Sequence, residues 1–192
     1  MTAAGSCVID AGGSEEVNKY LELCRGFAKD AYFLYDLDSL FVGNLRACVK
    51  ADGTLGSFLA ALGLGPDFTQ YCGLLDRKLT EAIQQINASA DPNLDSLRSY
   101  FKQLTGGEDF TNETLGRARV ATVVQIFRDR KSVTNATSQQ LVEDILGRLA
   151  QIASALSGKN IYLLTAGALE HYLPSYSGDP YDLPRFSGPN VT

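Results

Sequence analysis

The stretch Ala31-Tyr32-Phe33-Leu34-Tyr35-Asp36-Leu37-Asp38 decides the fold class of this chain. A continuous apolar run, unlike an alternating one, is typical of a strand buried on both faces of a parallel sheet. This run ends in two aspartates that are two residues apart. Comparable short runs occur at Cys7-Val8-Ile9 and at Ile161-Tyr162-Leu163-Leu164. The sequence therefore predicts three short parallel strands.

A helical pattern joins the first two of these strands. Ser14 is suited to cap a helix, and Gly26 lies near its expected end. One face of this helix is apolar, formed by Val17, Tyr20, Leu21 and Cys24. Together the three elements predict a β-α-β unit with a right-handed crossover.

A long helical region separates the second strand from the third. Gly63-Leu64-Gly65-Pro66 and Gly106-Gly107 interrupt it, and no part of it has a convincing strand pattern. The clearest helix is expected to begin at a Thr137–Gln140 capping box and to end at Gly158. Its apolar stripe consists of Leu141, Ile145, Leu149, Ile152 and Leu156.

These patterns predict an α/β fold with a small parallel sheet flanked by helices. A large helical insertion lies between the second and third strands. We expect residues 1–42 and 158–174 to form the α/β core and residues 43–157 to form the insertion. Residues 175–192, rich in Pro, Gly, Ser and Tyr, are expected to be an irregular tail. Three strands are few for such a fold, so the chain is expected to be a fragment or to complete its sheet with a partner.

The composition excludes several classes of protein. With 192 residues, 45% apolar and 20% charged, the chain is an ordinary globular sequence and not a disordered one. A net charge of −5 excludes a general polyanion binder, so any contact with nucleic acid needs a local basic patch, a metal or a partner. No apolar run reaches the ~20 residues that cross a bilayer, so no membrane contact is expected.

Cysteine usage predicts the compartment. The four cysteines form no Cys-x-x-Cys pair, and His171 is the only histidine, so a zinc site is not expected. The N-terminus has no pattern of a secretory signal. We therefore expect reduced thiols and a cytoplasmic location.

Carboxylates follow two of the predicted strands. Asp36 and Asp38 end the second one, where ligands bind in open α/β sheets, and Ser39 comes next. Carboxylate oxygens are the ligands that Mg²⁺ prefers, so this end of the strand is a candidate metal site. Glu170 follows the third strand and would reach the same edge. The alternative is that Asp38 caps the next helix, Asp36 is a turn residue and Glu170 is a first-turn helix residue.

Two further features suggest contact with phosphate. Gly12 and Gly13 precede a predicted helix and would permit close approach of an anion, although a plain turn explains them equally. Arg117 and Arg128 share a helical face and belong to the densest basic group. That group could contact DNA, or it could be a solvated helix face.

The ordered set of motifs resembles a known family. Val8-Ile9-Asp10-Ala11-Gly12-Gly13, the Asp36-Leu37-Asp38 strand end and the late Gly167-Ala168-Leu169-Glu170 element look like parts of a Toprim domain. With the long helical insertion, the set resembles the nuclease region of the overcoming-lysogenization-defect (OLD) family of ATP-dependent endonucleases. The resemblance covers residues 6–42 and 158–174.

This resemblance implies a metal-dependent DNA endonuclease. Asp36, Asp38 and Glu170 would be the catalytic carboxylates and, with Ser39, would bind Mg²⁺ or Mn²⁺. The mechanism would be hydrolysis of a phosphodiester with two metal ions. The resemblance also implies DNA as substrate, a homodimer, and an ATPase domain or chain supplied elsewhere.

The chain also departs from the family. A Toprim domain normally opens with a strand ending in Glu-Gly, and no such strand precedes Ser6. The family often has a basic residue near the late Gly-x-Leu-Glu element, where Lys159 is the substitute offered by this chain. A truncated Toprim module that acts in assembly or regulation is therefore the alternative. A phosphatase of the haloacid-dehalogenase type fits less well, because its aspartate nucleophile would follow the first strand.

Overall fold

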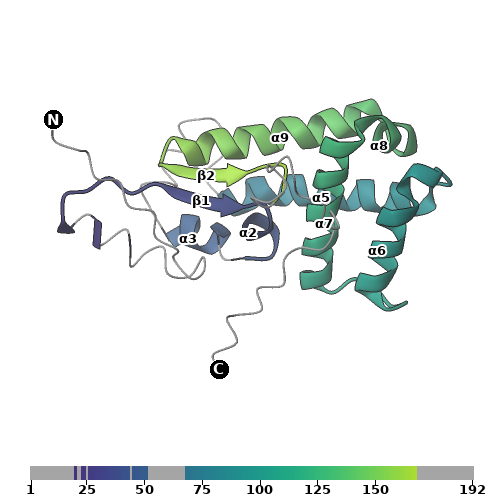
Figure 1. Ribbon diagram of the computed structural model, residues 1–192, viewed down its shortest axis with the longest axis horizontal. Coiled ribbons are helices and arrows are strands. Elements are labelled where there is room, and N and C mark those ends of the chain that lie inside the picture. Colours follow the sequence, from purple (N-terminus) through teal and green to yellow (C-terminus); the bar gives the residue numbers. More distant parts are fainter. Residues whose placement is uncertain (1–19, 21–22, 25, 44, 52–67, 168–192) are drawn as a thin grey trace, which may run out of the picture.

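The computed structural model describes residues 20, 23–24, 26–43, 45–51 and 68–167 of the chain (Figure 1). The predicted strand at 7–9 and the glycines that follow it lie outside these residues, as do Glu170, His171 and the tail. The elements in chain order are β1 (Phe33–Asp36), α2 (Asp38–Phe41), α3 (Leu45–Ala51), α5 (Phe68–Ala88), the 3₁₀ helix η2 (Pro92–Leu94), α6 (Asp95–Thr105), α7 (Asn112–Arg128), α8 (Arg130–Ala136), α9 (Gln139–Ser157) and β2 (Ile161–Leu164).

The two described strands form a small parallel sheet, as predicted. β1 pairs with β2 in a register that sets Phe33 opposite Ile161 and Asp36 opposite Leu164. The strands therefore end at the same edge of the sheet. The long connection between them is helical over its described part, and its last helix, α9, packs against β2 (Figure 1).

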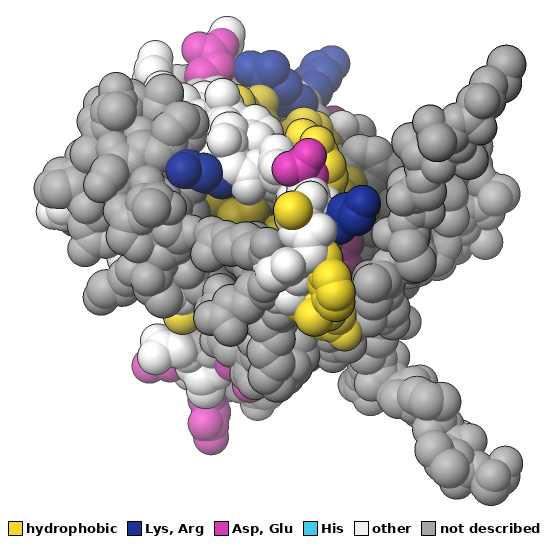
Figure 2. All heavy atoms as spheres, turned by 90° about the vertical axis from the view of Figure 1, so that its left-hand side faces the viewer, with side chains coloured by type: hydrophobic (Ala, Val, Ile, Leu, Met, Phe, Trp, Pro, Cys, Tyr) yellow, Lys and Arg dark blue, Asp and Glu magenta, His cyan; other side chains and the backbone are white. Residues whose placement is uncertain are grey.

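The described helices cover one face of this sheet, whereas the apolar runs predicted burial on both. Tyr35 is buried in the core, whereas its neighbour Leu34 is 60% exposed. Tyr32 and Tyr162 are also exposed on the outer side, and their rings stack with centroids 6.4 Å apart. The difference arises because the described helices that pack on the sheet lie against its inner face. Figure 2 shows hydrophobic side chains at the surface of the end of the molecule that lies on the left in Figure 1.

Helix α9 confirms the predicted stripe but not the predicted caps. All five stripe residues are buried. The N-cap is Ser138, whose hydroxyl accepts a hydrogen bond from the backbone N–H of Leu141 at 3.1 Å. Thr137 instead donates its hydroxyl to the Val133 carbonyl. At the other end Gly158 keeps right-handed helical angles, and Asn160 is the residue with positive φ.

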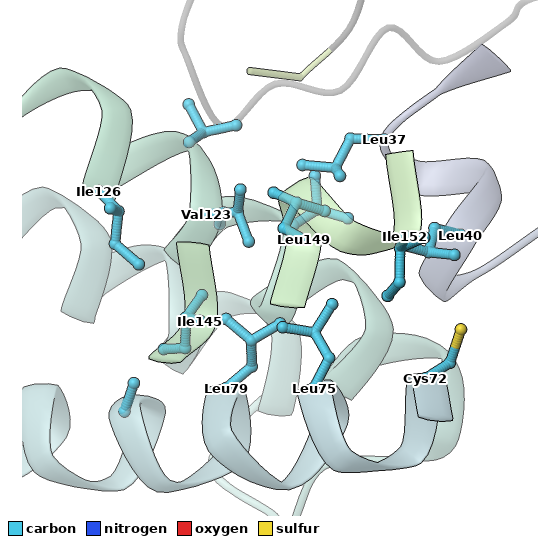
Figure 3. Packing of buried hydrophobic residues seen from close by; sticks show 14 of the residues in the cluster. Leu37, Leu40, Cys72, Leu75, Leu79, Val123, Ile126, Ile145, Leu149 and Ile152 are labelled. Carbon is cyan, nitrogen blue, oxygen red and sulfur yellow. The ribbon is translucent and has the colours of Figure 1, made fainter. Parts of the chain in front are cut away.

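One hydrophobic core joins the helical region to the sheet. In Figure 3, Leu75 and Leu79 of α5 point toward Leu149 and Ile152 of α9. Leu37, from the end of β1, belongs to the same buried cluster. Helix α7 runs steeply across the direction of α5 and α9 (Figure 1). It packs against α5 and adds its buried side chains to this core. The helical region therefore supports the sheet edge directly. None of the described helices is both long enough and apolar enough to cross a membrane.

Candidate functional site

The candidate site begins where β1 ends. Asp36 is the last residue of β1, and Leu37 turns into right-handed helical angles with its side chain fully buried. Asp38 is consequently the first residue of α2 and does not continue the strand. The strand alternation that would aim both carboxylates at one point therefore stops at Leu37, where the backbone takes up helical angles.

The turn after β2 is fastened to this point. The backbone N–H of Leu37 donates to the carbonyl of Gly167 at 3.3 Å. Gly167 has a φ of +123°, a conformation that L side chains rarely adopt, so glycine is needed there. The turn that begins the Gly-x-Leu-Glu element thus lies beside the Asp36–Asp38 strand end. Glu170 itself lies three residues beyond the described part of the chain.

Asp38 is a partly desolvated carboxylate. Burial raises its pKa, while a hydrogen bond from the backbone N–H of Ser39 and the positive charge of Arg117 act in the opposite direction. The alternative expectation that Asp38 caps α2 is wrong, because Leu37 holds the N-cap position and Asp38 lies in the first turn. Because desolvation is the largest effect, a cation at this carboxylate would stabilise its charged form.

Helix α7 reaches the sheet edge through Gly116. A Cβ atom on this residue would lie 2.8 Å from the carbonyl oxygen of Phe41 and 2.9 Å from Cγ2 of Val42, at the end of α2. Only glycine permits this approach without displacing the helix. Arg117 is the next residue, so the contact brings one arginine of the helical region close to Asp38.

Arg117 is held by a neighbour on its own helix. Its Nη2 atom donates to Oε1 of Glu113 at 2.7 Å, one turn earlier, and 44% of its side chain is exposed. An exposed pair of this kind is worth only about 0.3–0.5 kcal/mol. The guanidinium is therefore near the carboxylates, open to solvent and weakly held.

The other predicted phosphate contacts lie elsewhere. Lys159 precedes β2, so the whole strand, about 13 Å of chain, separates it from the carboxyl edge. Arg128 is exposed at the opposite end of α7, about 16 Å along the helix from Arg117. Gly12 and Gly13 lie outside the described residues. Of the predicted site residues, the structure places Asp36, Asp38 and Ser39 together at the end of β1, and Arg117 on the helix that packs against α2.

A second arginine of the basic group has a structural role that the sequence did not reveal. Arg119 faces inward, where its Nη1 lies 3.6 Å from Asp76 and its Nη2 donates to the hydroxyl of Thr80. Arg46 binds the same Asp76 with two hydrogen bonds of 2.7 Å. We call Arg46, Asp76 and Arg119 the interior ion cluster. Its members are 30 and 43 residues apart and come from three helices, so no local pattern predicts it.

The described residues alone do not complete a metal site. Within them, no group of three or more His, Cys, Asp or Glu side chains could hold an ion. Asp36 and Asp38 supply two carboxylates of the right chemistry, and Ser39 supplies a hydroxyl. No known protein family, curated protein or solved structure matches this chain.

Proposed function

We propose that this chain is the nuclease part of a metal-dependent DNA endonuclease of the OLD type. The observation that carries the proposal is the position of Asp36 and Asp38 at the carboxyl edge of a parallel sheet, beside the turn at Gly167. Ligands of open α/β sheets bind at this edge. The ordered motifs described above supply the reaction class, with Glu170 as the third carboxylate.

The residues present fit a divalent cation in their chemistry. Asp36, Asp38 and Ser39 offer oxygen ligands, and the desolvation of Asp38 favours a bound positive charge. When bound, Mg²⁺ or Mn²⁺ would supply Lewis-acid activation of water and stabilise the leaving 3′ oxygen. The protein's own contribution is to hold the two carboxylates at fixed positions. Leu37 lies between them in the chain, and its fully buried side chain anchors this segment in the core.

The test is nicking of supercoiled plasmid in Mg²⁺ or Mn²⁺, together with calorimetric titration of Mn²⁺. Asp36→Asn and Asp38→Asn keep the side-chain shape and remove the charge. We expect each to abolish metal binding and to lower nicking at least a hundredfold. Asp109→Asn is the matched control, because this aspartate is exposed and remote from α2 in the chain. Equal nicking by all four proteins would refute the nuclease proposal.

A second candidate function is assembly without cleavage. The outer face of the sheet favours it: Tyr32, Leu34 and Tyr162 are exposed there and none of the described helices covers it, whereas parallel sheets are normally covered on both faces. The partner in this candidate is a second copy of the chain. Three results together would support this function over the first: no metal binding, no nicking, and a dimer in light scattering that Leu34→Glu dissociates.

In the nuclease proposal, the ATPase is supplied by another domain or chain.

A further inference from the structure

In the proposed function, the edge that holds the Asp36 and Asp38 carboxylates would receive a negatively charged phosphodiester. Two carboxylates and a DNA phosphate repel one another unless cations lie between or beside them. Bound metal supplies part of this charge. A side-chain cation that contacts the phosphate directly would add hydrogen bonds that a metal ion cannot make.

Among the described residues, Arg117 is the arginine that meets the requirements for such a contact. It directly follows Gly116, which packs against the end of α2, the short helix that Asp38 begins. Nearly half of its side chain is open to solvent. The close approach of Gly116 to Phe41 determines which turn of α7 packs against the end of α2. The position of Arg117 therefore follows from the packing of these two helices. Arg119, two residues later, is committed to Asp76 and Thr80.

The pairing with Glu113 leaves Arg117 available. The pair lies on the solvent-exposed side of α7, and both side chains are substantially exposed. Exchanging the Glu113 carboxylate for a phosphate oxygen therefore costs little. A phosphate also offers the bidentate geometry that a guanidinium binds best.

We propose that Arg117 binds the DNA phosphate next to the Asp36–Asp38 carboxylates, and that Glu113 holds it when DNA is absent. The helical region would thus contribute a substrate-binding residue to the sheet edge, in the role that sequence analysis assigned to Lys159. This inference rests on the proposed endonuclease function. It differs from a general basic patch, because it gives Arg117 a role that Arg128 on the same helix does not share.

The test measures binding of a fluorescein-labelled duplex by anisotropy, with Ca²⁺ replacing Mg²⁺, over a series of NaCl concentrations. The proteins are the full chain, Arg117→Gln, Arg117→Lys and the matched control Arg128→Gln. We expect Arg117→Gln to weaken binding about tenfold and to reduce the salt-dependence slope by about one. Arg117→Lys should recover part of the affinity, because it keeps the charge without the fork geometry. Arg128→Gln should change affinity less than twofold.

Titration with Mn²⁺ separates this inference from the function on which it rests. Removing a cation near Asp38 should leave metal affinity unchanged or raise it a few-fold in Arg117→Gln. If the unaltered chain binds no metal, the endonuclease proposal fails. If metal binds normally but Arg117→Gln and Arg128→Gln weaken DNA binding equally, or neither does, only the role of Arg117 is overturned.

Discussion

Aspartate and arginine meet in two regions of this molecule, with opposite consequences. In the interior ion cluster, Asp76 accepts two short hydrogen bonds from Arg46 and lies near Arg119, and all three side chains are largely buried. At the sheet edge, the positive charge of Arg117 acts to lower the pKa of Asp38, while the Arg117 guanidinium itself donates a hydrogen bond to Glu113. In the interior ion cluster, the charged side chains pair with one another. In the second region, Arg117 is paired with Glu113 on the exposed side of α7, and the proposed function assigns Asp38 and Arg117 to ligands.

The largest effect is expected from breaking the interior ion cluster. Asp76→Ala would leave two arginines facing each other without a counter-charge, and should lower the free energy of unfolding by about 3 kcal/mol. Urea denaturation measures this loss. Asp144→Ala is the control, because its pair with Lys78 is more exposed and is worth less than about 1 kcal/mol. Equal losses in the two variants would show that burial adds nothing to the cluster.

A smaller effect is expected where the two regions share helix α7. Gly116→Ala would press a methyl group against the Phe41 carbonyl and Val42, at a cost of about 1–3 kcal/mol. Thermal unfolding measures the change. In α9, Gly147 has nothing within 4 Å of an added Cβ, so Gly147→Ala should stabilise the chain by about 0.5–1 kcal/mol. Stabilisation by both alanines would contradict the close approach of α7 to α2.

The smallest effect is expected at the sheet edge, where removing a charge should raise stability slightly. Because burial raises the pKa of Asp38, the folded state binds this proton more tightly than the unfolded state does. This contribution to stability is complete below the ordinary pKa of 3.8 and is lost as pH rises through the raised value. Asp38→Asn should therefore be slightly more stable than the unaltered chain near neutral pH, by less than about 1 kcal/mol.

Urea denaturation from pH 3 to pH 7 tests the sign of this effect. The difference in stability between Asp38→Asn and the unaltered chain should grow in favour of the variant as pH increases. Asp109→Asn, at an exposed aspartate, is measured alongside as the control. A variant that loses stability as pH increases would mean that the Asp38 carboxylate is structurally satisfied, like Asp76, and not held for a ligand.

Local pattern predicted the elements of the fold well. The strands at β1 and β2, the stripe of α9 and the parallel sheet follow from apolar runs and helical periodicity, which depend on near neighbours in the chain. The cap of α9 was wrong by one residue, because Thr137 and Ser138 can both serve and the hydrogen bond to Leu141 selects the second. The face on which the described helices pack could not be predicted, since an apolar run does not show which side of a strand a neighbour will cover.

Sequence by itself determined which residue types stand at the carboxyl end of β1: Asp36, Asp38 and Ser39, with the Gly167 turn after β2. The tertiary structure decided which arginine of helix α7 lies on the side of α2. Arg117 and Arg119 are two residues apart in one basic group, yet the packing of α7 directs one to the sheet edge and the other into the interior ion cluster. The physical reason is that a helix turns about 100° per residue, so its packing against α2 and α5 alone determines which side chain meets which neighbour.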